Sequence, residues 1–138
     1  MQREFARRFD QLDAIVAFTE RFFRQEGIDP ELRHVVDLCL EELFVNMVTY
    51  NTETQADILI ELAPHEGGVR LSLTDFDVDR FDPRSTAAVN PAAPLEERSP
   101  GGLGLYLVMK MASAIRYEYR DRTSLITVYA GAEGADDV

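Results

Sequence analysis

The chain has 138 residues, of which 46% are hydrophobic and 28% charged, a composition typical of one soluble globular domain. Its 25 acidic residues against 14 basic ones give a formal net charge of −11, which disfavours nucleic-acid binding because phosphates would be repelled. No apolar run reaches the roughly 18 to 20 residues of a membrane helix, and the charged start, MQREFARRFD, lacks the pattern of a signal peptide. The single cysteine, Cys39, cannot form an intrachain disulfide, so we expect a protein of the reducing cytoplasm.

The first third of the chain predicts a short strand and two helices. Apolar and polar residues alternate weakly over residues 4–9, which indicates an edge strand. Asp10 is a candidate N-cap for the amphipathic helix that follows, and Gly27 ends this helix. Asp29-Pro30-Glu31 combines a capping aspartate, a first-turn proline and an acid at the positive end of the helix dipole. The second helix is therefore expected to begin there and to run to about Tyr50.

The middle of the chain predicts a hairpin and then a long connection. Residues 58–62 and 69–74 alternate as two strands, joined by a His65-Glu66-Gly67-Gly68 turn. Between residues 76 and 100 the periodicity is lost and four prolines occur. Long connections without secondary structure are uncommon in compact domains and are often functional. We interpret this segment of about 25 residues as a lid.

The last part of the chain predicts a helix and a second hairpin. An apolar helix over residues 102–114 precedes strands over 115–120 and 124–129, and the acidic tail, residues 131–138, is expected to fray. The resulting order is β-α-α-β-β-lid-α-β-β. It predicts a single α+β domain over residues 1–138, a two-layer α/β sandwich with a mostly antiparallel sheet covered on one face by three helices.

A polar pair, Glu42 and Asn46, interrupts the apolar surface of the second predicted helix. Side chains four residues apart lie on one helical face, and a buried amide must be satisfied by a hydrogen bond or a ligand. An amide oxygen suits Mg2+, and a carboxylate one turn away can polarise an attacking hydroxyl or water. The same spacing also occurs on exposed helix faces without any function.

Two further features point to a nucleotide. Asp75 ends a predicted strand, where it either caps a turn or accepts a hydrogen bond from the exocyclic amine of adenine. Glycines before a helix allow phosphate to approach the backbone closely, and the free N–H groups of a helix start favour anions. The glycine-rich turn before the third helix consists of Gly101, Gly102, Leu103, Gly104 and Leu105. Glycine clusters are common in turns and helix caps, so a glycine cluster alone is weak evidence. The specific signal is the order in which the Glu-Asn pair, the strand-end aspartate and the glycine-rich turn follow one another.

The motifs follow one another in a definite order along the chain: E-x-x-x-N on a helix, a strand-end aspartate, a proline-rich connection, and GGLGL opening a helix. In this order they resemble the motifs of the GHKL ATPase superfamily. More narrowly, the chain resembles the small anti-sigma-factor serine/threonine kinases, which phosphorylate an antagonist protein. The resemblance runs from the second helix through the last strand. Its most particular segment is Leu95 to Val108, LEERSPGGLGLYLV, and the FDP of Phe81 to Pro83 also matches.

The resemblance implies a Bergerat-type ATP-binding fold that uses ATP and Mg2+. It makes Glu42 the general base and Asn46 the Mg2+ ligand, and it places the adenine contact at Asp75, with Asp77 as the alternative. Asp77 stands where the family usually has glycine, and Tyr50 stands where many relatives have histidine. The other implied nucleotide-binding positions are Phe81, Gly101, Gly102, Leu103, Gly104 and Leu105.

Protein partners are implied as well: a STAS-like anti-anti-sigma protein as phosphate acceptor, a sigma factor as a second partner, and a homodimer. The alternative is an inactive GHKL-fold regulator that binds a protein and has a degenerate nucleotide site, which Asp77 favours. A generic α+β domain, with Glu42 and Asn46 as accidents, fits the ordered motifs less well. A measurement of nucleotide binding would distinguish the generic domain from the kinase. A measurement of phosphate transfer to a partner would distinguish the kinase from the inactive regulator.

Overall fold

The computed structural model describes residues 1–82 and 102–131, which form five strands and three α-helices. Short 3-10 turns, Phe9–Gln11 and Pro30–Leu32, precede the first two helices. The elements in chain order are β1 (Gln2–Phe5), α1 (Leu12–Glu26), α2 (Arg33–Tyr50), β2 (Ile58–His65), β3 (Gly68–Phe76), α3 (Gly102–Met111), β4 (Ala114–Arg120) and β5 (Thr123–Ala130). This order of strands and helices is the one predicted from the sequence.

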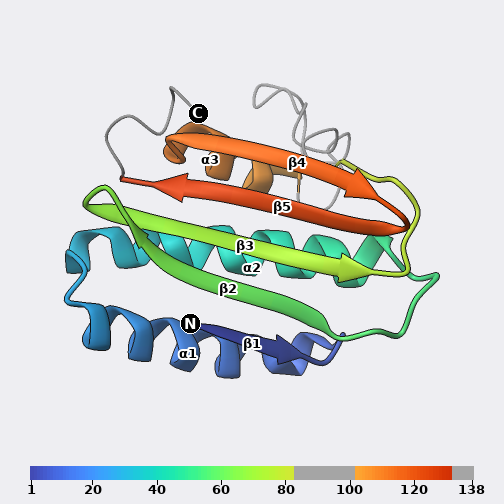
Figure 1. Cartoon of the computed structure of the whole chain (residues 1–138), viewed down its shortest axis with the longest axis horizontal. Helices are drawn as coiled ribbons and strands as arrows, with labels where there is room; N and C mark the ends of the chain where they lie inside the picture. The colour runs from blue at the N-terminus through green and yellow to red at the C-terminus, as the bar shows by residue number, and fades with distance from the viewer. Residues whose placement is uncertain (83–101, 132–138) are drawn as a thin grey trace.

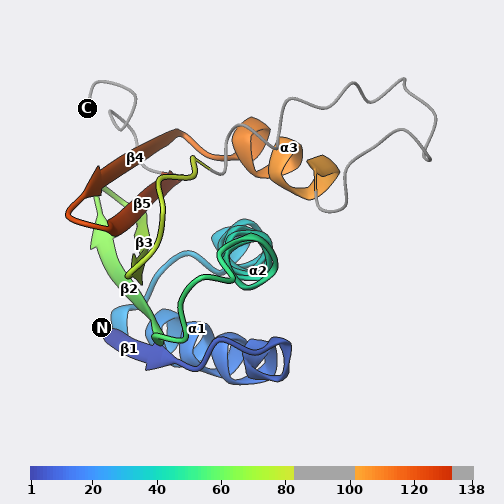
Figure 2. The same ribbon diagram turned by 90° about the vertical axis from the view of Figure 1, so that its right-hand side faces the viewer.

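The strands form one sheet in the order β1-β2-β3-β5-β4, and each neighbouring pair is antiparallel. The three helices lie on the same face of this sheet (Figure 1), and the view along the layers in Figure 2 shows α2 between α1 and α3. The predicted two-layer α/β sandwich is confirmed, with a sheet that is antiparallel throughout the described residues.

The hydrophobic core fills the space between the helices and the sheet. The register pairs Leu71 with Leu62 on one side and with Val128 on the other, so every second strand residue points toward the helices. Burial of these apolar side chains is the main force that holds the two layers together. Cys39 of α2 belongs to this core, and burial raises the pKa of its thiol to about 12, as suits a small buried hydrophobe.

Local signals in the sequence set several boundaries correctly. Gly27 ends α1 in a left-handed conformation, with φ of 64°. The Asp29 side chain accepts a hydrogen bond from the Glu31 backbone N–H at 3.0 Å, and the chain then turns into α2. In the β2–β3 hairpin, Glu66 and Gly67 form a two-residue turn with positive φ at both positions, the geometry that matches the twist of the flanking strands.

Three predicted boundaries were wrong. Strand β1 covers Gln2–Phe5 rather than residues 4–9, because the chain turns after Phe5 with a hydrogen bond from Arg8 N to Ala6 O. Asp10 lies inside the 3-10 turn, where it contacts Arg8 instead of capping a helix. Helix α3 ends at Met111 rather than at residue 114, because β4 already pairs with β5 from Ala114 onward.

The structure describes the first residues of the segment interpreted as a lid, residues 76–82. Phe76 is the last residue of β3, and residues 77–82 are held against the β4–β5 hairpin by contacts given below. The rest of the predicted lid, residue Gly101 and the predicted tail lie in residues 83–101 and 132–138, outside the described part. Of the helices in the described residues, none is both long and apolar enough to cross a membrane.

Candidate functional site

Helix α2 carries three of the predicted site residues in one line. Glu42, Asn46 and Tyr50 are spaced four residues apart, so they follow one face of the helix turn by turn. The opposite side of α2 is fixed in the core by fully or almost fully buried side chains, which include Val36, Leu40, Leu43, Phe44 and Met47. Packing of this apolar side therefore determines where the polar line points.

The start of α3 lies directly against Glu42. A β-carbon built on Gly104 would overlap the Glu42 carboxylate group, so any larger residue at this position of α3 requires the end of the Glu42 side chain to shift. Gly102 is the first residue of α3, and Leu103 and Leu105 lie in its first turns, but their side chains are outside the described set. The structure thus brings the glycine-rich turn and the candidate base together.

The Glu42 carboxylate is partly buried and makes no hydrogen bond or ion pair with another described side chain. Burial raises its pKa above the ordinary value, and the charge of the neighbouring Glu41 adds to the rise. A carboxylate with a raised pKa and unused acceptor positions is suited to take a proton from a nearby hydroxyl.

Asn46 lies one turn further along the same face and is only 6% exposed. Its side-chain amide forms no hydrogen bond with another described residue. A nearly buried amide without such a bond has donor and acceptor capacity to offer to a ligand. Its oxygen is the type of hard, neutral donor that Mg2+ accepts.

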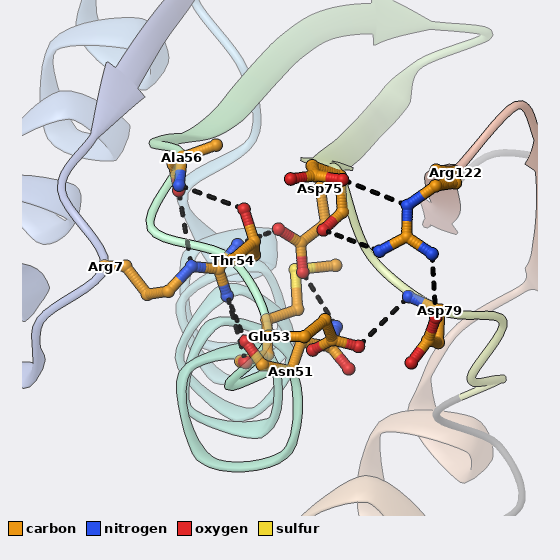
Figure 3. A network of polar contacts seen from close by, with 10 residues as sticks. Arg7, Asn51, Glu53, Thr54, Ala56, Asp75, Asp79 and Arg122 are labelled. Carbon is orange, nitrogen blue, oxygen red and sulfur yellow. Dashed lines mark hydrogen bonds and ion pairs between the residues drawn. The ribbon is translucent and has the colours of Figure 1, made fainter.

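Asp75 is completely buried near the end of β3, on the face of the sheet that points toward the helices. Both of its carboxylate oxygens are engaged (Figure 3): Oδ1 pairs with the guanidinium group of Arg7, and Oδ2 accepts a hydrogen bond from Asn51 Nδ2 at 2.7 Å. Burial raises the pKa of Asp75, while the hydrogen bonds from Asn51 and Arg7 oppose this rise.

Arg7 and Asn51 are site residues that the sequence did not reveal. Arg7 follows β1 and its side chain is 9% exposed. Besides Asp75, it binds the backbone carbonyls of Met47, Asn51 and Ala56 at 3.1 to 3.3 Å. No local pattern predicts an ion pair between residues 68 positions apart.

Asp77 occupies a different environment from Asp75. Its backbone is left-handed, with φ of 58°, a conformation that glycine adopts freely and that aspartate tolerates better than most residues. Its side chain is exposed and accepts a hydrogen bond from Arg122 Nε at 3.0 Å, while Arg122 also binds Asp79 at 2.8 Å. The Asp77 side chain therefore points toward the β4–β5 turn, and of these two aspartates Asp75 faces the helices.

Phe81 is held beside the end of α2. Its ring stacks on that of Tyr50 with centroids 5.6 Å apart and planes inclined by 22°. Its backbone N–H donates to Tyr117 Oη at 3.1 Å, and Tyr119 Oη donates to the carbonyl of Val78 at 2.8 Å. These contacts attach residues 77–82 to β4 on one side and to α2 on the other.

A family model of the histidine kinase-like ATPase domain matches residues 5–129, which is most of the chain. The chain belongs to the histidine kinase-like ATPase family. The GHKL superfamily predicted from the motifs is thereby confirmed, whereas the narrower likeness to anti-sigma-factor kinases stays a prediction.

Histidine kinase-like ATPase domains bind ATP, usually together with Mg2+. A search of curated proteins found no match to the chain. Among solved structures, the histidine kinase domain from Erythrobacter litoralis EL346 blue-light activated histidine kinase is similar, with 10% sequence identity and a TM-score of 0.49 over 94% of this chain and 67% of that chain.

In this histidine kinase-like domain, the described site residues fall into two connected groups. Gly104, Glu42, Asn46, Tyr50 and Phe81 follow the length of α2. The second group, Asp75, Arg7 and Asn51, lies at the C-terminal end of the same helix. Helix α2 therefore joins the Glu42–Gly104 contact, beside the start of α3, to the Asp75 cluster, beside the end of β3.

Proposed function

We propose that this domain binds ATP with Mg2+ and transfers the γ-phosphoryl group to a serine or threonine hydroxyl of a protein partner. The observation that carries the proposal is the packing of Gly104 against Glu42, with Asn46 one helical turn away. It gathers a helix start suited to phosphate, a candidate base and a candidate metal ligand at one place. The family supports the ATP-binding part of the proposal.

The residues present fit a nucleotide-bound Mg2+ ion. Among the described residues, no group of three or more His, Cys, Asp or Glu could hold a metal by itself. Mg2+ commonly takes one or two protein ligands and completes its shell with phosphates and water. Asn46, whose nearly buried amide forms no hydrogen bond with another described residue, would supply the protein oxygen.

ATP would supply the γ-phosphoryl group, and the bound Mg2+ would neutralise the negative charge that develops on the phosphate oxygens. Glu42 then accepts the proton of the acceptor hydroxyl as the new oxygen–phosphorus bond forms and the bond to the leaving ADP oxygen breaks. Its raised pKa favours this role, because a stronger base holds the proton more firmly. Asp75 accepts a hydrogen bond from the adenine amine, and Tyr50 with Phe81 borders the nucleotide.

The narrower assignment is an anti-sigma-factor type of kinase that acts in the cytoplasm. The resemblance of the LEERSPGGLGLYLV segment supports a STAS-like anti-anti-sigma substrate and a sigma factor as second partner. The formal net charge of −11 favours a partner with a basic surface over nucleic acid. The proposal that the domain forms a homodimer rests on the resemblance alone.

A second candidate is a regulator that binds a protein partner without transferring phosphate. The observation that favours it is the complete burial of Asp75, whose two oxygens are already engaged by Arg7 and Asn51. An adenine amine would have to share this carboxylate with groups of the chain itself.

Two measurements test these alternatives. Calorimetric titration of the wild-type protein with ATP and ADP, each with and without Mg2+, should give micromolar binding that depends on Mg2+. Purified STAS-domain proteins incubated with the domain and γ-labelled ATP should then acquire label, and Glu42→Gln should slow this labelling about 100-fold or more while ATP binding is retained. Binding without any labelling favours the regulator, and no binding at millimolar nucleotide rejects both the kinase and its nucleotide site.

A further inference from the structure

Arg7 connects the N-terminal segment to the candidate adenine contact. Its guanidinium group pairs with Asp75 Oδ1 and also binds the carbonyls of Met47, Asn51 and Ala56. Two of these carbonyls, those of Met47 and Asn51, lie at the C-terminal end of α2, where the helix dipole attracts a positive charge. Arg7 is thereby fixed in place by groups other than Asp75, so it can impose an orientation on that carboxylate.

The Asp75 carboxylate is held from two sides. Arg7 engages Oδ1, and Asn51 donates to the other oxygen, Oδ2, at 2.7 Å. An ionised carboxylate has about four acceptor positions, so each oxygen keeps one for a further donor. The carboxylate plane is fixed while acceptor capacity remains.

The charge of Asp75 depends on its neighbours. Complete burial disfavours the ionised form, and the nearby Glu53 acts in the same direction. Arg7 is the positive group among the charges that act on Asp75, and it opposes both effects. Without Arg7, the buried carboxyl group would therefore hold a proton more readily, and a protonated carboxyl group is a hydrogen-bond donor as well as an acceptor.

We propose that Arg7 is the residue that makes the site selective for adenine, because it holds Asp75 as a charged, oriented acceptor for the 6-amino group of the base. This inference rests on the proposed nucleotide binding and adds a residue that the family motifs do not contain. Adenine presents a donor at position 6, whereas hypoxanthine presents a carbonyl acceptor there. A charged acceptor distinguishes the two bases, and a carboxyl group that can also donate does not.

The test compares the affinities for ATP and for inosine triphosphate, each with Mg2+, by calorimetry. Wild type should bind ATP more tightly than inosine triphosphate, and Arg7→Met should lower this preference about tenfold or more. Arg8→Met is the matched control, because Arg8 is the next residue, is exposed and pairs with the exposed Asp10 at 3.1 Å; the preference of this variant should equal that of wild type. Arg7→Lys, which keeps the charge, should recover part of the preference.

The outcomes are separable. An equal loss of both affinities in Arg7→Met, with the preference unchanged, would overturn the inference, since Arg7 would then serve the fold alone. If Arg7→Met does not fold, Arg7→Gln removes the charge but keeps a donor for the α2 carbonyls, and the same comparison applies. A wild-type protein that binds neither nucleotide would reject the proposed function and this inference together.

Discussion

The carboxylate of Glu42 lies so close to the α-carbon of Gly104 that a β-carbon at position 104 would overlap it. The contact joins the middle of α2 to the first turns of α3. It couples the candidate base to the start of α3, because a side chain at position 104 would have to displace the Glu42 carboxylate. The glycine at this position therefore has a packing role that does not depend on any ligand.

Gly104→Ala should destabilise the protein by about 1 kcal/mol, the low end of the usual cost of overpacking, because the group that it meets is the flexible end of the Glu42 side chain. Alanine by itself would favour the helix by about 1 kcal/mol, so a net loss identifies the clash. Urea denaturation measures the change. In a Glu42→Ala background the carboxylate is gone, and Gly104→Ala should then be neutral or stabilising; an equal cost in both backgrounds would show that Glu42 is not the obstacle.

Asn46→Ala should weaken Mg2+-dependent ATP binding about tenfold or more while stability stays nearly unchanged. The side chain loses no hydrogen bond to a described residue, so its removal has little structural cost. Calorimetry with and without Mg2+ and urea denaturation give the two numbers. Thr49→Ala, an exposed position on the same helix, is the control. An unaltered affinity for Mg-ATP would remove Asn46 from the site.

Asn51→Ala should behave in the opposite way and destabilise the protein by about 1 to 3 kcal/mol, because it leaves the buried Asp75 without one of its partners. The measurement is again the free energy of unfolding in urea. The comparison with Asn46→Ala is informative, since the two asparagines differ by five positions on one chain segment. Equal stabilities of the two variants would contradict the structural role of Asn51.

Glu42→Gln should raise the urea midpoint at pH 7 and have no such effect well below pH 4.5. The folded-state pKa of Glu42 lies above its ordinary value of 4.5, so the folded protein binds the proton more tightly than the unfolded chain. The stability that Glu42 contributes is therefore complete below pH 4.5 and is lost as the pH rises through the folded-state pKa. Glutamine avoids this loss.

Asp77→Gly should change the affinity for Mg-ATP less than about threefold, because the Asp77 side chain is turned toward Arg122. The variant restores the residue that the family usually has at this left-handed position. Asp75→Asn should instead abolish most of the affinity. Calorimetry on both variants provides the measurement, and a tenfold gain in Asp77→Gly would place the aspartate side chain in the nucleotide site.

Several features of this domain could be predicted because they depend on residues close together in the chain. Hydrophobic periodicity gave the order of the elements, and Asp29 caps its helix through a bond only two residues away. The pairing of Glu42 with Asn46 follows from helix geometry alone. The boundaries of the helices and strands were harder to predict. The end of α3, for example, depends on where β4 begins to pair with β5.

The sequence by itself therefore determined the α+β sandwich and the family, through periodicity, caps and ordered motifs that need no knowledge of distant contacts. Only the tertiary structure decided that Arg7 and Asn51 hold Asp75, that Asp77 turns to Arg122, and that Gly104 meets Glu42. The physical reason is that a buried carboxylate takes whatever donors the packed layers bring beside it. Those donors lie on segments that are adjacent in space and far apart in the chain.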